Sequence, residues 1–527
     1  MIKIIVPGFG AGKYQVAAWC SQKRLTQILD SPNSNANPIH YELASPKTGG
    51  ISETDFFRYK GDWFLHKLKI WEQVLSNSNE EFYLHIDADA SATTSFSLQS
   101  LLIAFGDKSI GMVQQPRVLG NNPLGKKELY EHYLRVSHKA VNLGAPKSTL
   151  ETFIYFNSGF VLFRRRALEN FLQWAAEIMA KMPSEIDGQM VADQDILQVY
   201  ANEIVPEVIA ELDWRWNHCQ WWDADFPNPE AHVIHMSNFC QGPTATQMNR
   251  LAVLSRGNQV ENFSDLTVLM VSHNSGEILQ NSLDALLEIP GLSILVVDNN
   301  STQAPEATMN SRLRVMVNDT NLGYGAAVNI GLSQVKTEYV CLLNPDALLT
   351  YEATAEAMEK LREDANQLLA PNFFDSKGNF TASLRSGYPL SRLIEDLIPS
   401  PKNISRKIVS KVLGERVGSD FPWLIGACVF SSTKFLVDIG GLDQSYFLYM
   451  EDVELGRQAC QKGLVQSLES PIEHYGRQST DKSEIFIETE LSKARLKYLR
   501  RHFGFWPWVL MVFVHKLNTH YNHLFKG

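Results

Sequence analysis

The sequence lacks the cysteine spacing that marks zinc sites and redox couples. No two cysteines form a Cys-x-x-Cys pair; they stand apart as Cys20, Cys219, Cys240, Cys341, Cys428 and Cys460. Scattered thiols of this kind are typical of proteins in a reducing compartment. We therefore expect a cytoplasmic protein without a cysteine-bound metal.

An excess of positive charge is also missing. The chain has 58 acidic residues against 48 lysines and arginines, which gives a formal net charge of -10. Proteins that bind nucleic acids normally present a basic surface to the phosphates. The composition therefore argues against nucleic acid as a partner, and any anionic ligand has to be held by a local group of residues.

Long apolar runs are absent as well. The N-terminal segment MIKIIVPGFGAGKYQ has too short an apolar run for a signal peptide and no cleavage site of small residues. The run nearest in length to a membrane span, FWPWVLMVFV at 505–514, lies in a basic and aromatic tail, residues 491–527. Two interpretations of this tail stay open: peripheral contact with anionic lipid on the inner face of the cytoplasmic membrane, or a buried C-terminal helix.

What is present is an α/β pattern that occurs twice. A length of 527 residues exceeds what one core usually serves. We predict one domain at 1–250 and another at 265–490, joined by a polar linker at 251–264. In both, apolar strands alternate with helices, which predicts Rossmann-like, mostly parallel sheets with ligands beyond the carboxyl ends of the strands.

Carboxylates follow the apolar segments of the second half. Asp346 ends the strand EYVCLLNPDA and could bind a divalent cation, although a turn or helix-cap aspartate is the commoner case. Glu451 and Asp452 follow the aromatic run YFLYM, where burial would raise a carboxyl pKa towards that of a useful base. The alternative is an acidic first turn of a helix.

These residues belong to an ordered series of motifs. The series is VSHNS at 271–275, VVDNNS at 296–301, NLGYGAAVNIGL at 321–332, LLNPDA at 342–347, IGACVF at 425–430, GGLDQSYFLYMEDVEL at 440–455 and EHYG at 473–476. Over about residues 266–480 it resembles the family 2 glycosyltransferases of the GT-A fold. The likeness is greatest to the rhamnosyltransferase-like branch, which builds bacterial surface polysaccharides of the O-antigen (lipopolysaccharide) and capsule type.

The resemblance implies roles for individual residues. Asp452 would be the general base for the acceptor hydroxyl, with Glu451 beside it, in a displacement that inverts the anomeric carbon. Asp346 and His474 would bind Mn²⁺ or Mg²⁺ with the diphosphate; a lone histidine is otherwise more often structural. The nucleotide would lie against Asp298, Asn321, Gly323 and Asn329. The first acid of the family's Asp-x-Asp motif is replaced by Asn344, which leaves fewer charged ligands. The implied donor is dTDP-rhamnose, and the implied acceptor is a polyprenyl-diphosphate-linked glycan.

The first half contains HIDADA, with Asp87 and Asp89 at the end of an apolar strand. Alternation would put both carboxylates on one side, where they could bind one cation, although Asp-x-Asp is frequent by chance. YFNSGFVLF at 155–163, ADQDIL at 192–197 and HVIHMS at 232–237 follow. Over roughly residues 62–243 this order is similar to the family 8 glycosyltransferases, which are GT-A enzymes that retain the anomeric configuration.

That resemblance implies a metal held by Asp87, Asp89 and His235 and a UDP-sugar donor. The sugar and reaction centre would be lined by Asn157, Asp193, Gln194 and Asp195. His232 is a rival ligand whose strand parity matches a different face. The N-terminal VPGFGAGKYQ departs from the family, and it is no ATPase phosphate loop, because it is one residue short and Tyr14 replaces Ser or Thr. The tryptophan-rich segment 212–225 suits either sugar stacking or core packing.

The sequence thus predicts two GT-A domains in tandem and a bifunctional glycosyltransferase. The alternative is a single family 2 activity whose N-terminal domain is a noncatalytic glycan-binding or scaffold module. A hydrolase is disfavoured, because glycosidase carboxylates face each other across the scissile bond and need not be adjacent in sequence.

Overall fold

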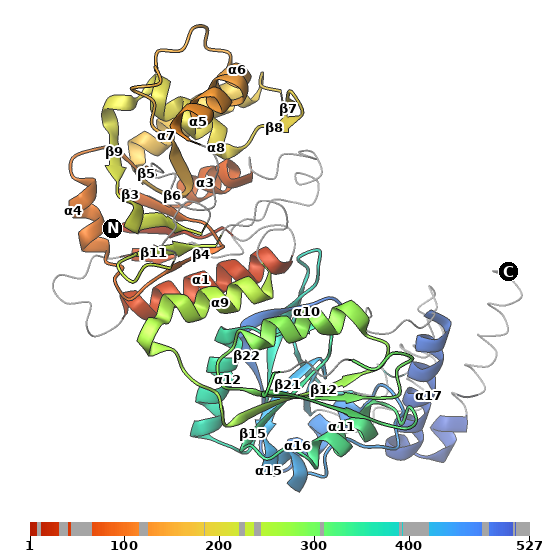
Figure 1. Ribbon diagram of the computed structural model, residues 1–527. Helices are drawn as coiled ribbons and strands as arrows, with labels where there is room; N and C mark the ends of the chain where they lie inside the picture. The colour runs from red at the N-terminus through yellow and green to blue at the C-terminus, as the bar shows by residue number, and fades with distance from the viewer. Residues whose placement is uncertain are drawn as a thin grey trace, which may run out of the picture. The chain divides into compact units, whose positions relative to one another are not determined.

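The computed structural model (Figure 1) describes residues 1–7, 12–30, 41–43, 66–114, 125–183, 185–220, 227–236, 244–305, 310–388, 393, 421–476, 484–509 and 512. The chain divides into two compact units. The N-terminal unit comprises residues 1–260 with 376–379, and the C-terminal unit comprises 261–375 with 380–527.

The N-terminal unit contains a six-stranded mixed sheet. Its strand order is β2 (Tyr41–Leu43), β1 (Ile2–Ile5), β3 (Phe82–Ile86), β6 (Phe156–Arg164), β5 (Ile110–Gln114) and β9 (Ile209–Leu212). Strand β6 runs antiparallel to β3 and β5, whereas β2, β1 and β3 are mutually parallel, as are β5 and β9. A small sheet of β10 (His218–Cys219), β11 (Val233–His235) and β4 (Ala90–Ala92) lies beside it.

Helices cover both faces of this sheet because its central strands are apolar on both sides. Along β6, Phe160 and Leu162 belong to one buried cluster, and Val161 and Phe163 belong to another. The α-helices are α1 (Gly12–Leu29), α3 (His66–Ser76), α4 (Leu98–Phe105), α5 (Lys126–His132), α6 (Lys139–Val141), α7 (Arg165–Met179), α8 (Asp193–Val199) and α9 (Ala245–Arg256), with π-helices η3 (Tyr133–His138) and η4 (Tyr200–Ile204). Helices α1 and α9 lie side by side (Figure 1). Because α9 extends to Arg256, residues 251–256 of the predicted linker are helical.

The C-terminal unit is built on a larger mixed sheet. Its order is β14 (Leu313–Val317), β13 (Ser293–Asp298), β12 (Leu266–Ser272), β15 (Tyr339–Leu343), β21 (Cys428–Ser432), β17 (Gln367–Phe374), β22 (Leu464–His474) and β16 (Ala347–Leu348), with β18 (Phe380–Thr381) beside β17. The first four strands are parallel, and β21 is antiparallel to both its neighbours. The α/β fold class predicted from the sequence is confirmed.

The helices of this unit are α10 (Gly276–Leu287), α11 (Tyr324–Leu332), α12 (Tyr351–Glu363), α15 (Thr433–Asp438), α16 (Glu451–Ala459) and α17 (Glu484–Phe503). Strands β19 (Leu384–Ser386) and β20 (Pro422–Leu424) pair separately. Helix α17 buries Tyr498 and Leu499 in an apolar cluster that includes Trp423 of β20. Beyond it, Phe505 is 56% exposed and Trp506 77% exposed. None of the helices among the described residues is long and apolar enough to cross a bilayer.

Candidate active sites

The carboxyl ends of the parallel strands in the C-terminal unit open into a cavity of about 790 Å³. Residues that follow β12, β13 and β15 line one side of it, and the start of α16 with Ile487 and Leu491 of α17 lines another. Of the residues predicted from the sequence, the cavity brings together Asn321, Gly323, Asp346, Glu451, Asp452 and His474. A cavity at this edge of a sheet is where α/β folds bind their ligands.

Asp346 and His474 meet because two strands pair. Strand β16 places Ala347 directly opposite His474 in β22, and Nε2 of His474 lies 3.4 Å from Oδ1 of Asp346. The Asp346 side chain is almost fully buried, and its Oδ1 has no hydrogen-bond partner within the described part of the chain. A buried carboxylate oxygen and an imidazole nitrogen that lie together at a cavity wall fit a divalent cation.

The adjacent carboxyls of Glu451 and Asp452 begin helix α16 on the cavity wall. Burial raises the pKa of both groups, and the neighbouring charge of Asp452 raises that of Glu451 further. Backbone N–H groups oppose the upward shift in the pKa of Asp452; among them, Val453 donates to its carboxylate at 2.8 Å and Gly426 at 3.3 Å. Asp452 is therefore the carboxyl of the pair that ionises more readily, as a base near neutral pH must.

The turn before these carboxyls is strained. Tyr449 and Met450 both have φ of 70°, a left-handed conformation that non-glycine residues rarely adopt. Gly323 also has a positive φ, of 84°, and a Cβ there would lie 2.5 Å from the backbone oxygen of Phe447. Glycine at 323 thus allows the loop before α11 to pack against the loop that carries Glu451. This close approach connects two walls of the cavity.

Asp298 and Asn329 do not line this cavity. Asp298 is fully buried and accepts hydrogen bonds from the backbone and hydroxyl of Ser301. Asn329 is bonded to the backbone of Leu442. The cavity residue at the end of β13 is instead Asn299, whose amide bonds Asn321 at 2.9 Å.

Tyr324 is a second cavity residue that the sequence did not single out. Burial, with Glu451 and Asp452 nearby, raises its pKa. Only the position of Tyr324 inside the motif NLGYGAAVNIGL could have drawn attention to it.

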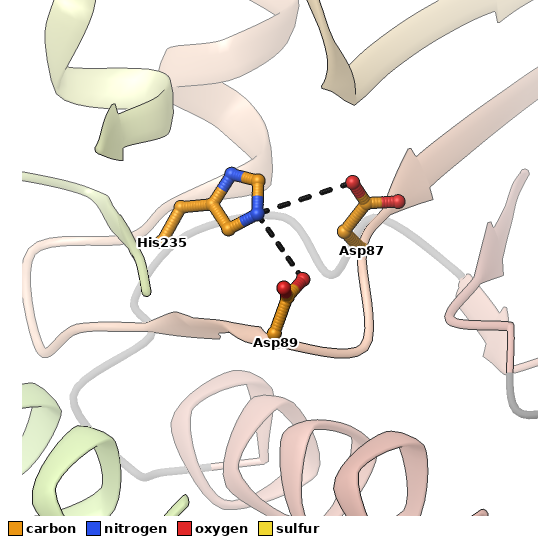
Figure 2. Close-up of side chains that lie close together, drawn as sticks. All are labelled: Asp87, Asp89 and His235. Atoms are coloured by element: carbon orange, nitrogen blue, oxygen red, sulfur yellow. Dashed lines mark hydrogen bonds and ion pairs between the residues drawn. The ribbon is translucent and has the colours of Figure 1, made fainter. Parts of the chain in front are cut away.

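In the N-terminal unit, Asp87, Asp89 and His235 converge as Figure 2 shows, and one ligand atom from each lies within 4.8 Å of the others. His235 Nε2 is 3.1 Å from Oδ1 of Asp89 and 4.0 Å from Oδ2 of Asp87. The main chain arranges this, because β11 pairs His235 with Ala90. Three such atoms fit one divalent cation, so the residues predicted as ligands are brought together.

A buried lysine, Lys67 of α3, was missed by the sequence reasoning. Its Nζ lies 2.8 Å from Oδ1 of Asp87 and 3.0 Å from Oδ2 of Asp193. Burial opposes ionisation of Asp87, but Lys67 and His85 outweigh it and hold the pKa of Asp87 well below its usual range. Both partners bond Oδ1, so Oδ2 is the oxygen that faces His235. No local sequence pattern marks Lys67, which lies on an ordinary amphipathic helix.

The remaining predicted residues are held by hydrogen bonds. Gln194 accepts a hydrogen bond from the backbone of Ser158 at 2.7 Å, and Asn157 accepts one from Gly159 at 2.6 Å. Asp195 accepts from Ser137 of η3 at 2.5 Å, and burial raises its pKa. His232 bonds the backbone oxygen of Ser95 and packs on Trp216, away from the ligand set.

Two predicted features lie partly outside the described residues. The first is the N-terminal glycine-rich loop, whose residues 8–11 lie outside them. In the tryptophan-rich segment, Trp216 is buried in the core, as the packing interpretation predicts, whereas Trp221 and Trp222 fall outside the described part.

A family model described as Glycosyl transferase family 2 matches residues 267–410. The chain is a glycosyltransferase. The match places a family 2 domain in the C-terminal unit and contains Asp346, whereas Glu451, Asp452 and His474 lie beyond its end. The family 8 resemblance of the N-terminal unit stays a prediction.

Two curated proteins resemble this glycosyltransferase. An N-acetylglucosaminyl-diphospho-decaprenol L-rhamnosyltransferase of Mycobacterium tuberculosis is 27% identical over 274 residues, which is 46% of this chain and 86% of that protein. The low-salt glycan biosynthesis hexosyltransferase Agl10 of Haloferax volcanii is 22% identical over 205 residues, 38% of this chain and 63% of that protein.

Among solved structures, GalNAc-T7 with UDP, GalNAc and Mn²⁺ is 13% identical with a TM-score of 0.34. That match covers 53% of this chain, which spans about half (51%) of the GalNAc-T7 chain. Staphylococcus aureus TarS 1–349 is 16% identical with a TM-score of 0.28, over 45% of this chain and 73% of that one.

Proposed function

We propose that the C-terminal unit transfers L-rhamnose from dTDP-rhamnose to an N-acetylglucosaminyl group on a polyprenyl diphosphate. One observation carries the proposal: a single cavity contains the Asp346–His474 pair and the Glu451–Asp452 carboxyls, in a unit with a family 2 domain. The sugar and acceptor are taken from the name of the mycobacterial relative. The product would extend a lipid-linked precursor of a surface glycan.

In this mechanism Asp452 takes the proton of the acceptor hydroxyl. The acceptor oxygen then forms its bond to the anomeric carbon while the bond from that carbon to the diphosphate breaks, which inverts the configuration. A divalent cation held by Asp346 and His474 would neutralise the departing diphosphate. Asn299, Asn321 and Gly323 would contact the nucleotide. Glu451 would help to keep the general base, Asp452, in a part of the cavity wall with little access to water.

For the N-terminal unit we propose a second, retaining transfer from a UDP-sugar. Asp87, Asp89 and His235 would hold the cation, and Asn157, Asp193, Gln194 and Asp195 would surround the sugar. Convergence of the three ligand atoms supports catalysis over the alternative of a scaffold module, which would not need them. Because the two carboxylate sets belong to separate units, each transfer should be separable by mutation.

The test is a panel of nucleotide sugars, including dTDP-rhamnose and UDP-sugars, offered with synthetic N-acetylglucosaminyl-diphosphate-lipid acceptors. Released nucleotide diphosphate is measured for the native chain and for Asp89→Ala and Asp346→Ala. We expect Asp89→Ala to lose only the UDP-sugar reaction and Asp346→Ala only the dTDP-rhamnose reaction. Absence of any UDP-sugar reaction in the native chain would favour the scaffold alternative, and loss of both reactions in a folded Asp89→Ala variant would contradict separate sites.

A lipid-linked acceptor suits the exposed end of α17. Exposed Phe505, Trp506 and Val509 follow four basic residues of α17, Lys493, Lys497, Arg500 and Arg501, of which Lys493 is paired with Glu490 and Arg501 with Asp443. Basic residues beside exposed aromatics favour binding to an anionic lipid surface. Phe505→Ser/Trp506→Ser should reduce sedimentation with phosphatidylglycerol vesicles, whereas Ile103→Ser, which removes a 74% exposed apolar side chain elsewhere, should not. Equal sedimentation of both variants would count against this contact.

A further inference from the structure

Asn217 lies between two predicted site residues without having been predicted itself. It ends the short 3₁₀ helix Trp214–Asn217 and is completely buried. Its Oδ1 lies 3.1 Å from Nδ1 of His235, and its Nδ2 lies 2.7 Å from Oδ1 of Asn157. Asn217 therefore contacts His235 on the side of the ring opposite to Asp89.

The direction of these hydrogen bonds follows from one group whose polarity is fixed. The backbone N–H of Gly159 can only donate, so the Asn157 atom 2.6 Å from it must be an oxygen. That same oxygen receives the Asn217 side chain, which must offer its NH₂ group there. The other end of the Asn217 amide, which faces His235, is then the carbonyl oxygen.

A carbonyl oxygen only accepts, so Nδ1 of His235 must carry a proton. The remaining ring nitrogen, Nε2, points at Asp87 and Asp89. In the singly protonated imidazole, Nε2 then has the free electron pair that a metal requires. Histidine ligands in metal sites usually donate their second N–H to an oxygen acceptor, which fixes both the tautomer and the ring orientation.

Packing leaves the ring little freedom to turn away. A Cβ at Gly159 would lie 2.6 Å from Cε1 of His235, 2.8 Å from Oδ1 of Asn157 and 2.9 Å from Oδ2 of Asp87. The space beside Gly159 is thus filled by the ligand group and by the hydrogen-bond chain that orients it. The backbone N–H of Met236 also donates to the carbonyl of Asp89, which fixes the distance between the two strands.

We propose that Asn217 is a positioning residue, which holds His235 with a proton on Nδ1 and so presents Nε2 to a divalent cation shared with Asp87 and Asp89. The proposal rests on the proposed metal-binding function of the N-terminal unit. Asn217 does not contact the cation or the substrate. It acts through His235, and Asn157 acts through Asn217.

The first measurement is Mn²⁺ affinity by titration calorimetry and electron paramagnetic resonance, on the full chain in an Asp346→Ala background that disables the other candidate site. Asn217→Leu should weaken binding by about 10- to 100-fold, the usual effect of losing such a partner. Asn202→Leu is the matched control, because Asn202 is also a buried asparagine but bonds the backbone of Ile154 and Gln198.

The second measurement is the tautomer itself, read from ¹⁵N chemical shifts of histidine-labelled native protein, with His235 assigned by its loss in His235→Gln. We expect Nδ1 of His235 to be protonated with or without Mn²⁺. An unprotonated Nδ1, or unchanged Mn²⁺ affinity in folded Asn217→Leu, would overturn the proposal. If Asp89→Ala binds Mn²⁺ as tightly as the chain with Asp89, the site at Asp87, Asp89 and His235 binds no Mn²⁺ and the proposed metal function fails. The protonation of Nδ1 of His235 still tests the role of Asn217 in that case. The tautomer also decides it if Asn217→Leu does not fold.

Discussion

Nε2 of His474 lies 3.4 Å from Oδ1 of Asp346, at the point where the last long strand of the C-terminal sheet passes the short strand that follows Asp346. The carboxylate is buried, whereas the histidine is partly open to the cavity. The pair thus joins a sheltered negative charge to an accessible nitrogen. This is the arrangement expected of a cation site that a diphosphate must reach.

Asp346→Asn should weaken Mn²⁺-dependent binding of dTDP as well as slow the reaction, because a cation ligand acts on both the bound diphosphate and the departing one. His474→Gln should have the same effect with a smaller loss, since it removes no charge. Calorimetry with dTDP, in the presence and absence of Mn²⁺, measures the binding term. Equal dTDP affinity of Asp346→Asn and the native chain in Mn²⁺ would show that the cation binds elsewhere.

Asp452→Asn should lower kcat of the proposed rhamnosyl transfer by about 10²- to 10⁴-fold and leave dTDP and Mn²⁺ affinity nearly unchanged, because it removes only the proton acceptor. The native rate should rise with pH as Asp452 loses its proton, at a pH above the usual range for aspartate, since burial raises its pKa. The residual rate of Asp452→Asn should lack that rise. Steady-state rates from pH 5 to 9 test both points, and substantial activity in Asp452→Asn would make Glu451 or another residue the base.

Glu451→Gln should raise the Tm of the C-terminal unit at pH 9 more than at pH 5. Burial raises the pKa of Glu451, so the folded protein favours the protonated form. The stability from that proton is complete below the unfolded pKa, about 4.3, and is lost as the pH rises through the raised value. Glutamine does not ionise and escapes the loss. Thermal melts at the two pH values decide the point, and an equal change in Tm at both would show that Glu451 ionises normally.

Much of this site could be predicted from the sequence because strands and motifs are local. The run LTVLMVS is β12, and the order of the acidic motifs placed Asp346, Glu451 and Asp452 in one cavity. Asp298 and Asn299 are adjacent, and which of them faces the cavity depends on where β13 bends, which no pattern shows. The helix α9 did have a signal, since Thr244 and Gln247 form a capping box.

Contacts between distant segments could not be predicted in this way. Lys67 contacts Asp87 from a helix, and Asn217 contacts His235 from a short 3₁₀ helix. The segments that carry these contacts are far from Asp87 and Asp89 in the chain, so only tertiary packing reveals them. The polar partners of a site carry no spacing rule of their own. The sequence therefore indicates ligands more readily than the residues that orient them.

Gly323→Ala should destabilise the C-terminal unit by about 1–3 kcal/mol more than Gly440→Ala, because only the first forces a methyl group against rigid backbone. Both positions have positive φ, 84° and 96°, but a Cβ at Gly440 meets nothing within 4 Å. Both substitutions place alanine at a positive φ, so the difference between the two variants leaves out the cost of backbone strain. The urea concentrations at the midpoints of unfolding are measured for the two variants. Equal midpoints would mean that the backbone at Phe447 moves to accommodate the methyl group at little cost.

The left-handed turn at Tyr449 and Met450 is supported by a contact from a helix that follows it in the chain. Each such residue costs on the order of 1–3 kcal/mol, so the turn persists only when its surroundings impose it. Part of those surroundings is α17, because His502 bonds Glu454 in the first turns of α16. The last strand of the cavity, β22, ends at His474, and α17 follows it in the chain. We therefore expect a chain cut short ahead of this helix to lose the transfer of the C-terminal unit and to keep the transfer proposed for the N-terminal unit.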